Sequence, residues 1–205
     1  MLCGMISSMQ WIIAGLGNPD TEYNGTRHNT GRDFLAALVK KEGAGEWKND
    51  KKLKAQVLMG RLFGKKVTLL LPETYMNNSG LSFKTLVGSK KHAESLVVLQ
   101  DELDLPLGKV KISFGSSAGG HNGILSVQKA VKTKDFIRIR IGISPSTPSG
   151  KLKKPDAEKI VPFVLGKFKP AEEDKLKKAR KLVAEALQDL LTDGREVATM
   201  RLHSK

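Results

Sequence analysis

Short β-rich runs alternate along the chain with segments of helical periodicity, and no other feature of the sequence constrains its fold as strongly. The strand-like runs occupy residues 11–14, 56–63, 66–71, 95–100, 109–114 and 136–143. Helix-like segments cover residues 33–39, 79–87 and 170–191, and one more runs through residue 131. Strands that alternate with helices predict an α/β domain with helices flanking a twisted sheet.

Two of the strand-like runs predict a β-hairpin. The segments QVLMGRLF (56–63) and KVTLLL (66–71) are separated by Gly64-Lys65, and Pro72 is expected to stop the second strand. The hairpin is antiparallel, so the sheet is predicted to be mixed. The run SLVVLQ (95–100) is apolar without alternation, as in a central strand, and is expected to end at Asp101.

Residues 136–143 alternate between polar and apolar side chains. This pattern places Arg138 and Arg140 on one face of a strand and the isoleucines on the other. We therefore expect the two arginines to share a surface.

One domain is expected over residues 11–205, since 205 residues are too few for two. The leader, residues 1–10, is predicted to be disordered and lacks a signal-peptide pattern, and Met5 or Met9 is a possible start. The Pro- and Ser-rich segment 144–156 is read as a mobile loop, because too little chain follows it to fold alone.

Composition narrows the class of protein. No apolar run approaches the roughly 20 residues that a membrane helix needs, so no membrane partner is expected. Cys3 is the one cysteine, which excludes a disulfide within the chain and a cysteine-based metal site, and a reducing cytoplasm fits.

The charge of the chain points to a polyanionic partner. Lys and Arg total 35 against 21 Asp and Glu, a net charge of +14. A lysine-rich surface that only aids solubility is the alternative. Aromatic residues make up 5% of the chain and are dispersed, so contact with backbone phosphates is favoured over base stacking.

The run GLGNPDTEYNGTRHNTG, residues 15–31, follows the first predicted strand. Gly15 and Gly17 match the first two glycines of a dinucleotide-binding fingerprint, but Asp20 stands at the third position. A pyrophosphate would meet that carboxylate, so a nucleotide cofactor is disfavoured. Asn18-Pro19 instead favours a turn that holds Asn18 near the end of the strand.

Four predicted loops, residues 15–31, 72–80, 101–108 and 115–123, follow strands, and a sheet can bring them together at one edge. They carry one plausible base, several carboxylates and three amides. These include His28, Asp101, Asn18, Asn77, His121 and Asn122.

Their side chains favour activation of water over a covalent acyl-enzyme. No cysteine is available there, and the nearby serines lack a nucleophile-elbow context. His28, with an ordinary pKa near ~6.5, can accept a proton at neutral pH if a carboxylate such as Asp101 fixes its tautomer. Amides such as Asn18, Asn77 and Asn122 can donate to a carbonyl or an oxyanion.

Each of these residues also has a structural interpretation. His28 alone could be a loop histidine bonded to backbone, Asp101 a turn residue, and Asn77 or Asn122 a helix cap. A metal site of His28, His121 and Asp101 is conceivable, but the histidines lack metal-binding helical spacing. We therefore expect no metal and no cofactor.

Six motifs in this order resemble the bacterial-type peptidyl-tRNA hydrolases. They are GLGNPDTEYNGTRHNTG, LLLPETYMNNSG, VVLQDELDLPLGKVKI, GSSAGGHNGI, RIRIGIS and FVLGKF, which span about residues 11–168, and the tail TDGREVATMRLH is also similar. The resemblance implies a monomeric α/β enzyme. Its reaction would be hydrolysis of the ester between a peptide and the 3′ end of tRNA, which recycles tRNA from aborted translation.

The resemblance also implies roles for residues. His28 would activate water, Asp101 would keep His28 able to accept a proton, and Asn18 would tell a blocked α-amino group from a free one; Asn77 completes the expected catalytic set. The expected substrate-binding residues are Tyr23, Tyr75, Met76, Asn77, His121 and Asn122.

One part of the pattern departs from the family. Arg140 matches an arginine that holds the tRNA 5′-phosphate together with a second basic residue, but Ser113 stands where many members carry Lys or Arg. Lys111 could substitute, as could the loop lysines Lys151, Lys153 and Lys154. Residues 144–159 also look longer and more basic than the matching loop of the family, which borders the substrate channel.

Two other functions stay open. A non-catalytic RNA-binding protein is the first, since the fold is known in an organellar intron-splicing relative. An esterase for small substrates is the second, because the water-activating set is generic. Salt separates the enzyme hypotheses, since affinity for tRNA should fall steeply with salt.

Overall fold

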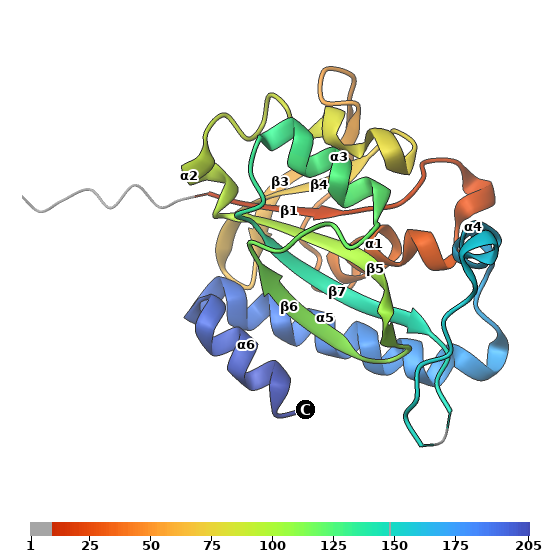
Figure 1. Ribbon diagram of the computed structural model, residues 1–205. Helices are drawn as coiled ribbons and strands as arrows, with labels where there is room; N and C mark the ends of the chain where they lie inside the picture. The colour runs from red at the N-terminus through yellow and green to blue at the C-terminus, as the bar shows by residue number, and fades with distance from the viewer. Residues whose placement is uncertain (1–9, 148) are drawn as a thin grey trace, which may run out of the picture.

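The computed structural model describes residues 10–147 and 149–205 and shows one seven-stranded sheet with helices on both faces (Figure 1). The expected leader, residues 1–10, lies almost wholly outside the described residues. The strand order is β2-β3-β4-β1-β5-β7-β6. The strands are β1 (Trp11–Gly15), β2 (Lys48–Asp50), β3 (Ala55–Leu62), β4 (Lys65–Pro72), β5 (Leu96–Pro106), β6 (Val110–Phe114) and β7 (Ile137–Ser144).

The sheet is mixed, as predicted. Strand β1 pairs in parallel with β4 and β5, and β5 pairs in parallel with β7. The hairpin β3–β4 and the edge strands β2 and β6 supply the antiparallel pairs. The predicted hairpin is confirmed, with Phe63-Gly64 as its turn.

Helices cover the sheet in two layers (Figure 1). Apolar side chains of α3 and of the 3₁₀ segment η3 pack on one face, and those of α1, α5 and α6 on the other. The α-helices are α1 (Thr30–Glu42), α2 (Lys90–Ala93), α3 (Asn122–Val131), α4 (Ile160–Leu165), α5 (Glu173–Asp193) and α6 (Arg195–His203). The 3₁₀ segments are η1 (Thr21–Tyr23), η2 (Arg27–Asn29), η3 (Met76–Ser82), η4 (Ala157–Lys159) and η5 (Pro170–Glu172). No helix in these described ranges is both long and apolar enough to cross a bilayer.

Alternation along the central strands builds the two cores. Ile13 and Leu99 face α1 and α5, whereas Ala14 and Val98 face α3. All four are 0% exposed. Full burial of a large aliphatic side chain stabilises a fold by about 1.5–3 kcal/mol. Because both faces of these strands are covered, their sequences are apolar without alternation.

Strand β5 is longer than predicted. The sequence suggested an end at Asp101, but β5 continues to Pro106, and Asp101 pairs with Ile141 of β7. Pairing with β1 stops at Leu99, so the rest of the strand extends past β1 with β7 as its neighbour. Residues 101–106 are therefore strand rather than loop.

Two other local predictions were wrong. Residues 79–87 do not form an α-helix, because the chain folds instead as η3 followed by turns. A Cβ on Gly80 would lie 2.2 Å from the carbonyl oxygen of Ser126, so this close approach to α3 requires glycine. Arg138 and Arg140 lie on one face of β7, as predicted, but Arg138 is buried there, with 3% exposed, so the expected shared surface does not form.

Candidate active site

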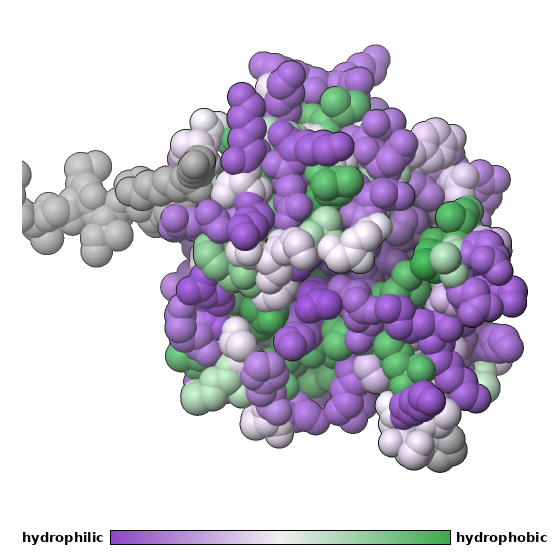
Figure 2. All heavy atoms as spheres, in the orientation of Figure 1, coloured by the Kyte–Doolittle hydropathy of each residue, from purple (hydrophilic) through white to green (hydrophobic). Residues whose placement is uncertain are grey.

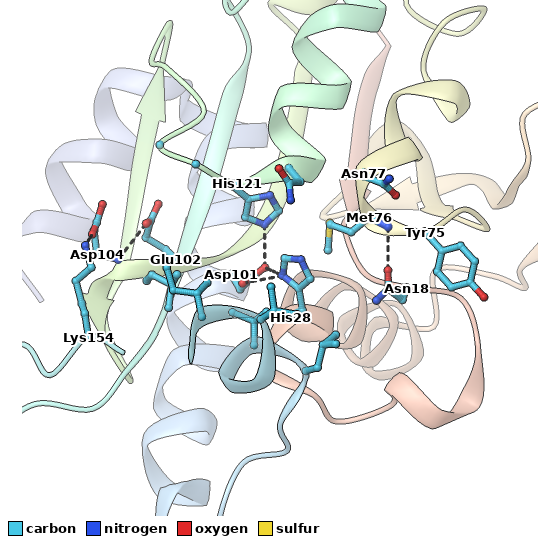
Figure 3. A pocket seen from close by; sticks show the side chains of 18 residues that line it. Asn18, His28, Tyr75, Met76, Asn77, Asp101, Glu102, Asp104, His121 and Lys154 are labelled. Atoms are coloured by element: carbon cyan, nitrogen blue, oxygen red, sulfur yellow. Dashed lines mark hydrogen bonds and ion pairs between the residues drawn. The ribbon is translucent and has the colours of Figure 1, made fainter. Parts of the chain in front are cut away.

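A pocket of about 460 Å³ opens beyond the carboxyl ends of β1 and β4 and along the free end of β5 (Figure 3). Eight predicted site residues line it, from four separate segments of the chain: Asn18, His28, Tyr75, Met76, Asn77, Asp101, His121 and Asn122. Tyr23, Arg140 and Lys111 lie outside this lining. The expected convergence of segments at one edge of the sheet thus occurs.

His28 and Asp101 form the centre of the pocket. The Nδ1 atom of His28 lies 3.0 Å from each carboxylate oxygen of Asp101. His28 lies on η2, directly before α1, and α1 packs unusually close to the sheet because a Cβ on Gly31 would lie 2.3 Å from the carbonyl oxygen of Leu99. This close packing brings the histidine to the strand that carries Asp101.

A second histidine holds the same carboxylate. His121 Nε2 lies 2.9 Å from Oδ1 of Asp101, and His121 Nδ1 accepts the backbone N–H of Ile124 at 3.3 Å as the N-cap of α3. Because Nδ1 accepts, the proton of a neutral His121 is on Nε2. Both ring nitrogens of His121 are therefore engaged by the protein.

The hydrogen bonds also fix the tautomer of His28. An ionised carboxylate only accepts, so Asp101 orders His28 with a proton on Nδ1 and a lone pair on Nε2. Burial by itself would raise the pKa of Asp101, but His28 and His121 outweigh it and hold the pKa well below its usual range. Asp101 is thus ionised at neutral pH.

The carboxylate acts on His28 in return. Burial would lower the pKa of His28, but the charge of Asp101 and its hydrogen bond raise the pKa above the ordinary value. The side chain of His28 is 15% exposed against 3% for Asp101, so His28 is the more accessible of the two from the pocket.

The three central groups also have the spacing of a metal site. The ligand atoms of His28, Asp101 and His121 lie within 4.8 Å of one another. In this structure they are hydrogen-bonded to each other, so the two ring atoms that face the carboxylate carry protons rather than free lone pairs. The donor set therefore fits a hydrogen-bonded dyad with a supporting histidine better than a metal centre.

Asn18 is fixed by a neighbour that the sequence reading did not single out. Its backbone N–H donates to Asn29 Oδ1 at 2.8 Å, and Asn29 Nδ2 donates to the carbonyl of Asn18 at 3.0 Å. The side-chain Oδ1 of Asn18 accepts the N–H of Met76 at 2.8 Å (Figure 3). Asn18 Nδ2 is left as a donor, with no acceptor among the described residues.

The other predicted polar residues lie around this centre. Asn77 on η3 and Asn122 at the start of α3 are exposed at the pocket. Tyr75 is 53% exposed, donates to Asp20 Oδ2 at 3.2 Å and packs edge-to-face on Tyr23 with ring centroids 6.4 Å apart. Tyr23 therefore contacts Tyr75 but does not itself line the pocket.

An apolar wall from α4 closes one side of the pocket, and the sequence did not predict it. Ile160, Val161, Val164 and Leu165 all line the cavity. Val161 is 62% and Leu165 39% exposed, and Figure 2 shows green side chains where α4 lies in Figure 1. Short and interrupted by Pro162, α4 carries no clear helical pattern.

Arg27 fixes this wall next to His28. The guanidinium carbon of Arg27 lies 4.6 Å from the ring centroid of Phe163 and 4.5 Å from that of Phe168. Its nitrogens donate to both carboxylate oxygens of Glu172, at 2.8 and 3.1 Å, and to the carbonyl of Ile143 at 3.2 Å. Arg27, which directly precedes His28, thereby contacts α4, the segment that follows α4 and the end of β7.

The residues expected at the tRNA phosphate lie on β6 and β7. Arg140 stands opposite Lys111 in register, and its Nε donates to Oε2 of Glu102 at 2.6 Å. Ser113 stands opposite Arg138, with its hydroxyl buried and unpartnered among described residues. Lys154 lines the pocket, where it pairs with Asp104 of β5.

Comparison with known proteins gives one consistent result. The family model described as peptidyl-tRNA hydrolase matches residues 12–205. Peptidyl-tRNA hydrolases of Halalkalibacterium halodurans and Dehalococcoides mccartyi are each 39% identical to this chain, over 86% and 94% of it and 91% and 99% of their own lengths. The crystal structure of peptidyl-tRNA hydrolase from Acinetobacter baumannii is similar at a TM-score of 0.82, with 33% identity and 97% of both chains covered.

Proposed function

The chain belongs to the peptidyl-tRNA hydrolase family, and from that premise we propose how its pocket hydrolyses peptidyl-tRNA. The bond cleaved is the ester between the peptide and the 3′ end of tRNA. The observation that carries the proposal is the ordered chain from His121 through Asp101 to His28, which leaves one basic nitrogen facing an open pocket.

His28 is the general base. Its Nε2 takes a proton from water as the water oxygen bonds to the ester carbonyl carbon, and Asp101 stabilises the imidazolium that forms. When the intermediate collapses, the bond to the ribose oxygen breaks and His28 returns the proton to that oxygen. The products are free tRNA and the peptide's carboxylic acid, which loses its proton to solvent. Such base catalysis typically contributes about 10²- to 10⁴-fold.

The exposed amides stabilise the negative charge that develops on the carbonyl oxygen of the ester. Asn77 and Asn122 approach the pocket from η3 and α3, on the same side as His121. Neutral N–H donors stabilise an oxyanion without adding a charge that would hold the product carboxylate. Asn77 therefore belongs to the proposed catalytic set.

Asn18 selects the blocked amino group. Because Met76 occupies Oδ1 of Asn18, the group offered to the substrate is the Nδ2 donor. The Nδ2 group can donate to the carbonyl oxygen of a peptide or an N-acyl group, whereas a free α-ammonium brings its own donors and a positive charge. The fixed amide thus favours peptidyl-tRNA over aminoacyl-tRNA.

The remaining lining contacts the rest of the substrate. Tyr75, packed on Tyr23, and Met76 form one side for the peptide, and the apolar wall of α4 forms the other. Arg140 and Lys111 bind the tRNA 5′-phosphate, and the net charge of +14 supports backbone contact more broadly. We further propose that the protein acts as a monomer in the cytoplasm, where peptidyl-tRNA arises.

A non-catalytic RNA-binding role is the alternative, and the intact dyad argues against it. The deciding experiment measures release of labelled N-acetyl-aminoacyl groups from tRNA by the wild type and by His28→Ala. We expect a loss of about 10²- to 10⁴-fold, with His92→Ala, an exposed histidine on α2, as the control that keeps activity. Full activity in His28→Ala would exclude this mechanism, and tight tRNA binding without turnover in the wild type would favour the alternative.

A further inference from the structure

Two consecutive residues of β5 face opposite sides of the sheet and hold different functional groups. Asp101 binds His28, and Glu102 binds Arg140. Successive side chains of a strand alternate, so this division follows from the backbone of β5 itself. Glu102 belongs to the carboxylates expected near the site, but the sequence assigned it no role, and it lines the pocket.

Glu102 holds Arg140 in one orientation. Its Oε2 accepts Arg140 Nε at 2.6 Å, and its Oε1 accepts the backbone N–H of Asp104 at 3.0 Å. The side chain of Glu102 is 10% exposed and both of its carboxylate oxygens are engaged, so it is itself fixed. Because the bond uses the Nε edge of a planar guanidinium, both Nη groups of Arg140 are left for another acceptor.

The surroundings of Arg140 favour an anion as that acceptor. Arg138, Arg140 and Lys111 project from the same face of β7 and β6, and Glu102 is the carboxylate bonded among them. Arg138 is buried and has no ion-pair partner among the described residues. Burial and the charge of Arg140 lower the pKa of the Arg138 guanidinium and outweigh the opposing charge of Glu102. Glu102 is already bonded to Arg140, so a bound anion would offset part of the cost of burying the second cation.

We infer that Glu102 is a positioning residue for tRNA: it fixes Arg140 so that both Nη groups meet the 5′-phosphate. This inference rests on the proposed function. The backbone from Asp101 to Glu102 then sets the distance between the hydrolytic base and the phosphate contact. The simpler view, that Glu102 only competes with phosphate for Arg140, predicts the opposite sign when the carboxylate is removed.

The test uses two N-acetyl-aminoacyl RNA minihelices that differ only in a 5′-phosphate or a 5′-hydroxyl. For the wild type we expect a lower KM with the phosphorylated substrate. Glu102→Gln should raise that KM about tenfold, as for a lost hydrogen bond to a charged group, with kcat nearly unchanged. Its preference for phosphate should approach that of Arg140→Ala.

Two further variants serve as controls for Glu102→Gln. Glu196→Gln breaks an exposed Glu–Arg pair on α6 with the same change of charge and should keep the wild-type preference. Glu102→Asp keeps the charge but shortens the reach, so it should also lose the preference, which separates positioning from electrostatics. Thermal unfolding of each variant checks that the fold is intact.

The outcomes are distinct. A lower KM, or an unchanged preference, in Glu102→Gln would overturn the inference while hydrolysis by His28 still stood. A wild type without any preference for phosphate would remove the role of Arg140 and the inference built on it. Absence of any hydrolysis by the wild type would instead contradict the proposed function.

Discussion

His121 donates through Nε2 to the carboxylate of Asp101 at 2.9 Å, and so shares with His28 the one acceptor at the centre of the site. The sequence suggested that His121 contacts substrate. With both of its ring nitrogens engaged, the side chain instead has a structural reason to orient Asp101. Kinetics can distinguish a residue that orients Asp101 from one that contacts substrate.

We predict that His121→Asn lowers kcat about tenfold with little change in KM. Asparagine is a good N-cap and can maintain the start of α3, but it is too short to reach Asp101, so one charge-assisted hydrogen bond is lost. Steady-state kinetics on N-acetyl-aminoacyl-tRNA checks this, with His92→Asn as the matched control. A rise in KM at constant kcat would instead identify His121 as a substrate contact.

The pH dependence of kcat/KM should report His28. The proposed mechanism needs the neutral imidazole, so activity should fall as pH drops through the pKa of His28, which lies above its ordinary value. Asp101→Asn removes the charge that raises this pKa while burial remains, so the acidic limb should move to lower pH as the maximal rate falls. An acidic limb at the same pH in both proteins would rule out His28 as the group that titrates.

Asn18→Asp should weaken discrimination between blocked and free amino groups. The aspartate can still accept the N–H of Met76, but its second oxygen replaces the Nδ2 donor. We expect the ratio of kcat/KM for N-acetyl-aminoacyl-tRNA over aminoacyl-tRNA to fall about tenfold or more. An unchanged ratio would show that the selection is made elsewhere.

Arg27→Met should destabilise the protein by about 3–5 kcal/mol, because it leaves a partly buried Glu172 without its partner. For a chain of this size that corresponds to a Tm lower by roughly 6–20 °C. Arg195→Met is the matched control, since Arg195 also stacks on a phenylalanine and pairs with a glutamate, but at the surface. Calorimetry of the two variants should therefore differ clearly.

Salt dependence should identify the phosphate contacts. If Lys111 contacts a phosphate, Lys111→Ala should reduce the slope of log KM against log salt by about 1. Lys181→Ala removes an exposed lysine of α5, outside the pocket, and should leave the slope unchanged. Equal slopes in the wild type and in Lys111→Ala would direct attention to the loop lysines Lys151 and Lys153.

Local patterns predicted the elements whose signal is strong. The hairpin, α1 and α5 were predicted correctly because the spacing of their apolar residues and the residues that end each element agree. Gly43 follows α1 and Gly194 follows α5. Elements with weak or contradictory signals were missed: β2, α2, α4 and α6. Arg138 was placed on a surface because alternation says which residues share a face and not whether that face is covered.

The site shows the same limit. The sequence predicted that His28 and Asp101 meet at the carboxyl ends of neighbouring strands, although Asp101 lies within β5, where that strand extends past β1, and not on a loop. The support behind the site depends on tertiary contacts that no spacing reveals. The amide pair of Asn18 with Asn29 and the bond from Glu102 to Arg140 are of this kind.

The close approach of α1 to the sheet has a consequence for the reaction. A Cβ on Gly15 would lie 2.5 Å from the carbonyl oxygen of Gly31, and a Cβ on Gly31 would lie 2.3 Å from that of Leu99. One added methyl group at either position would push η2, and the imidazole it carries, away from its aspartate. The proposed proton transfer therefore depends on two residues that have no side chain, and a screen confined to the groups in contact with substrate would overlook both.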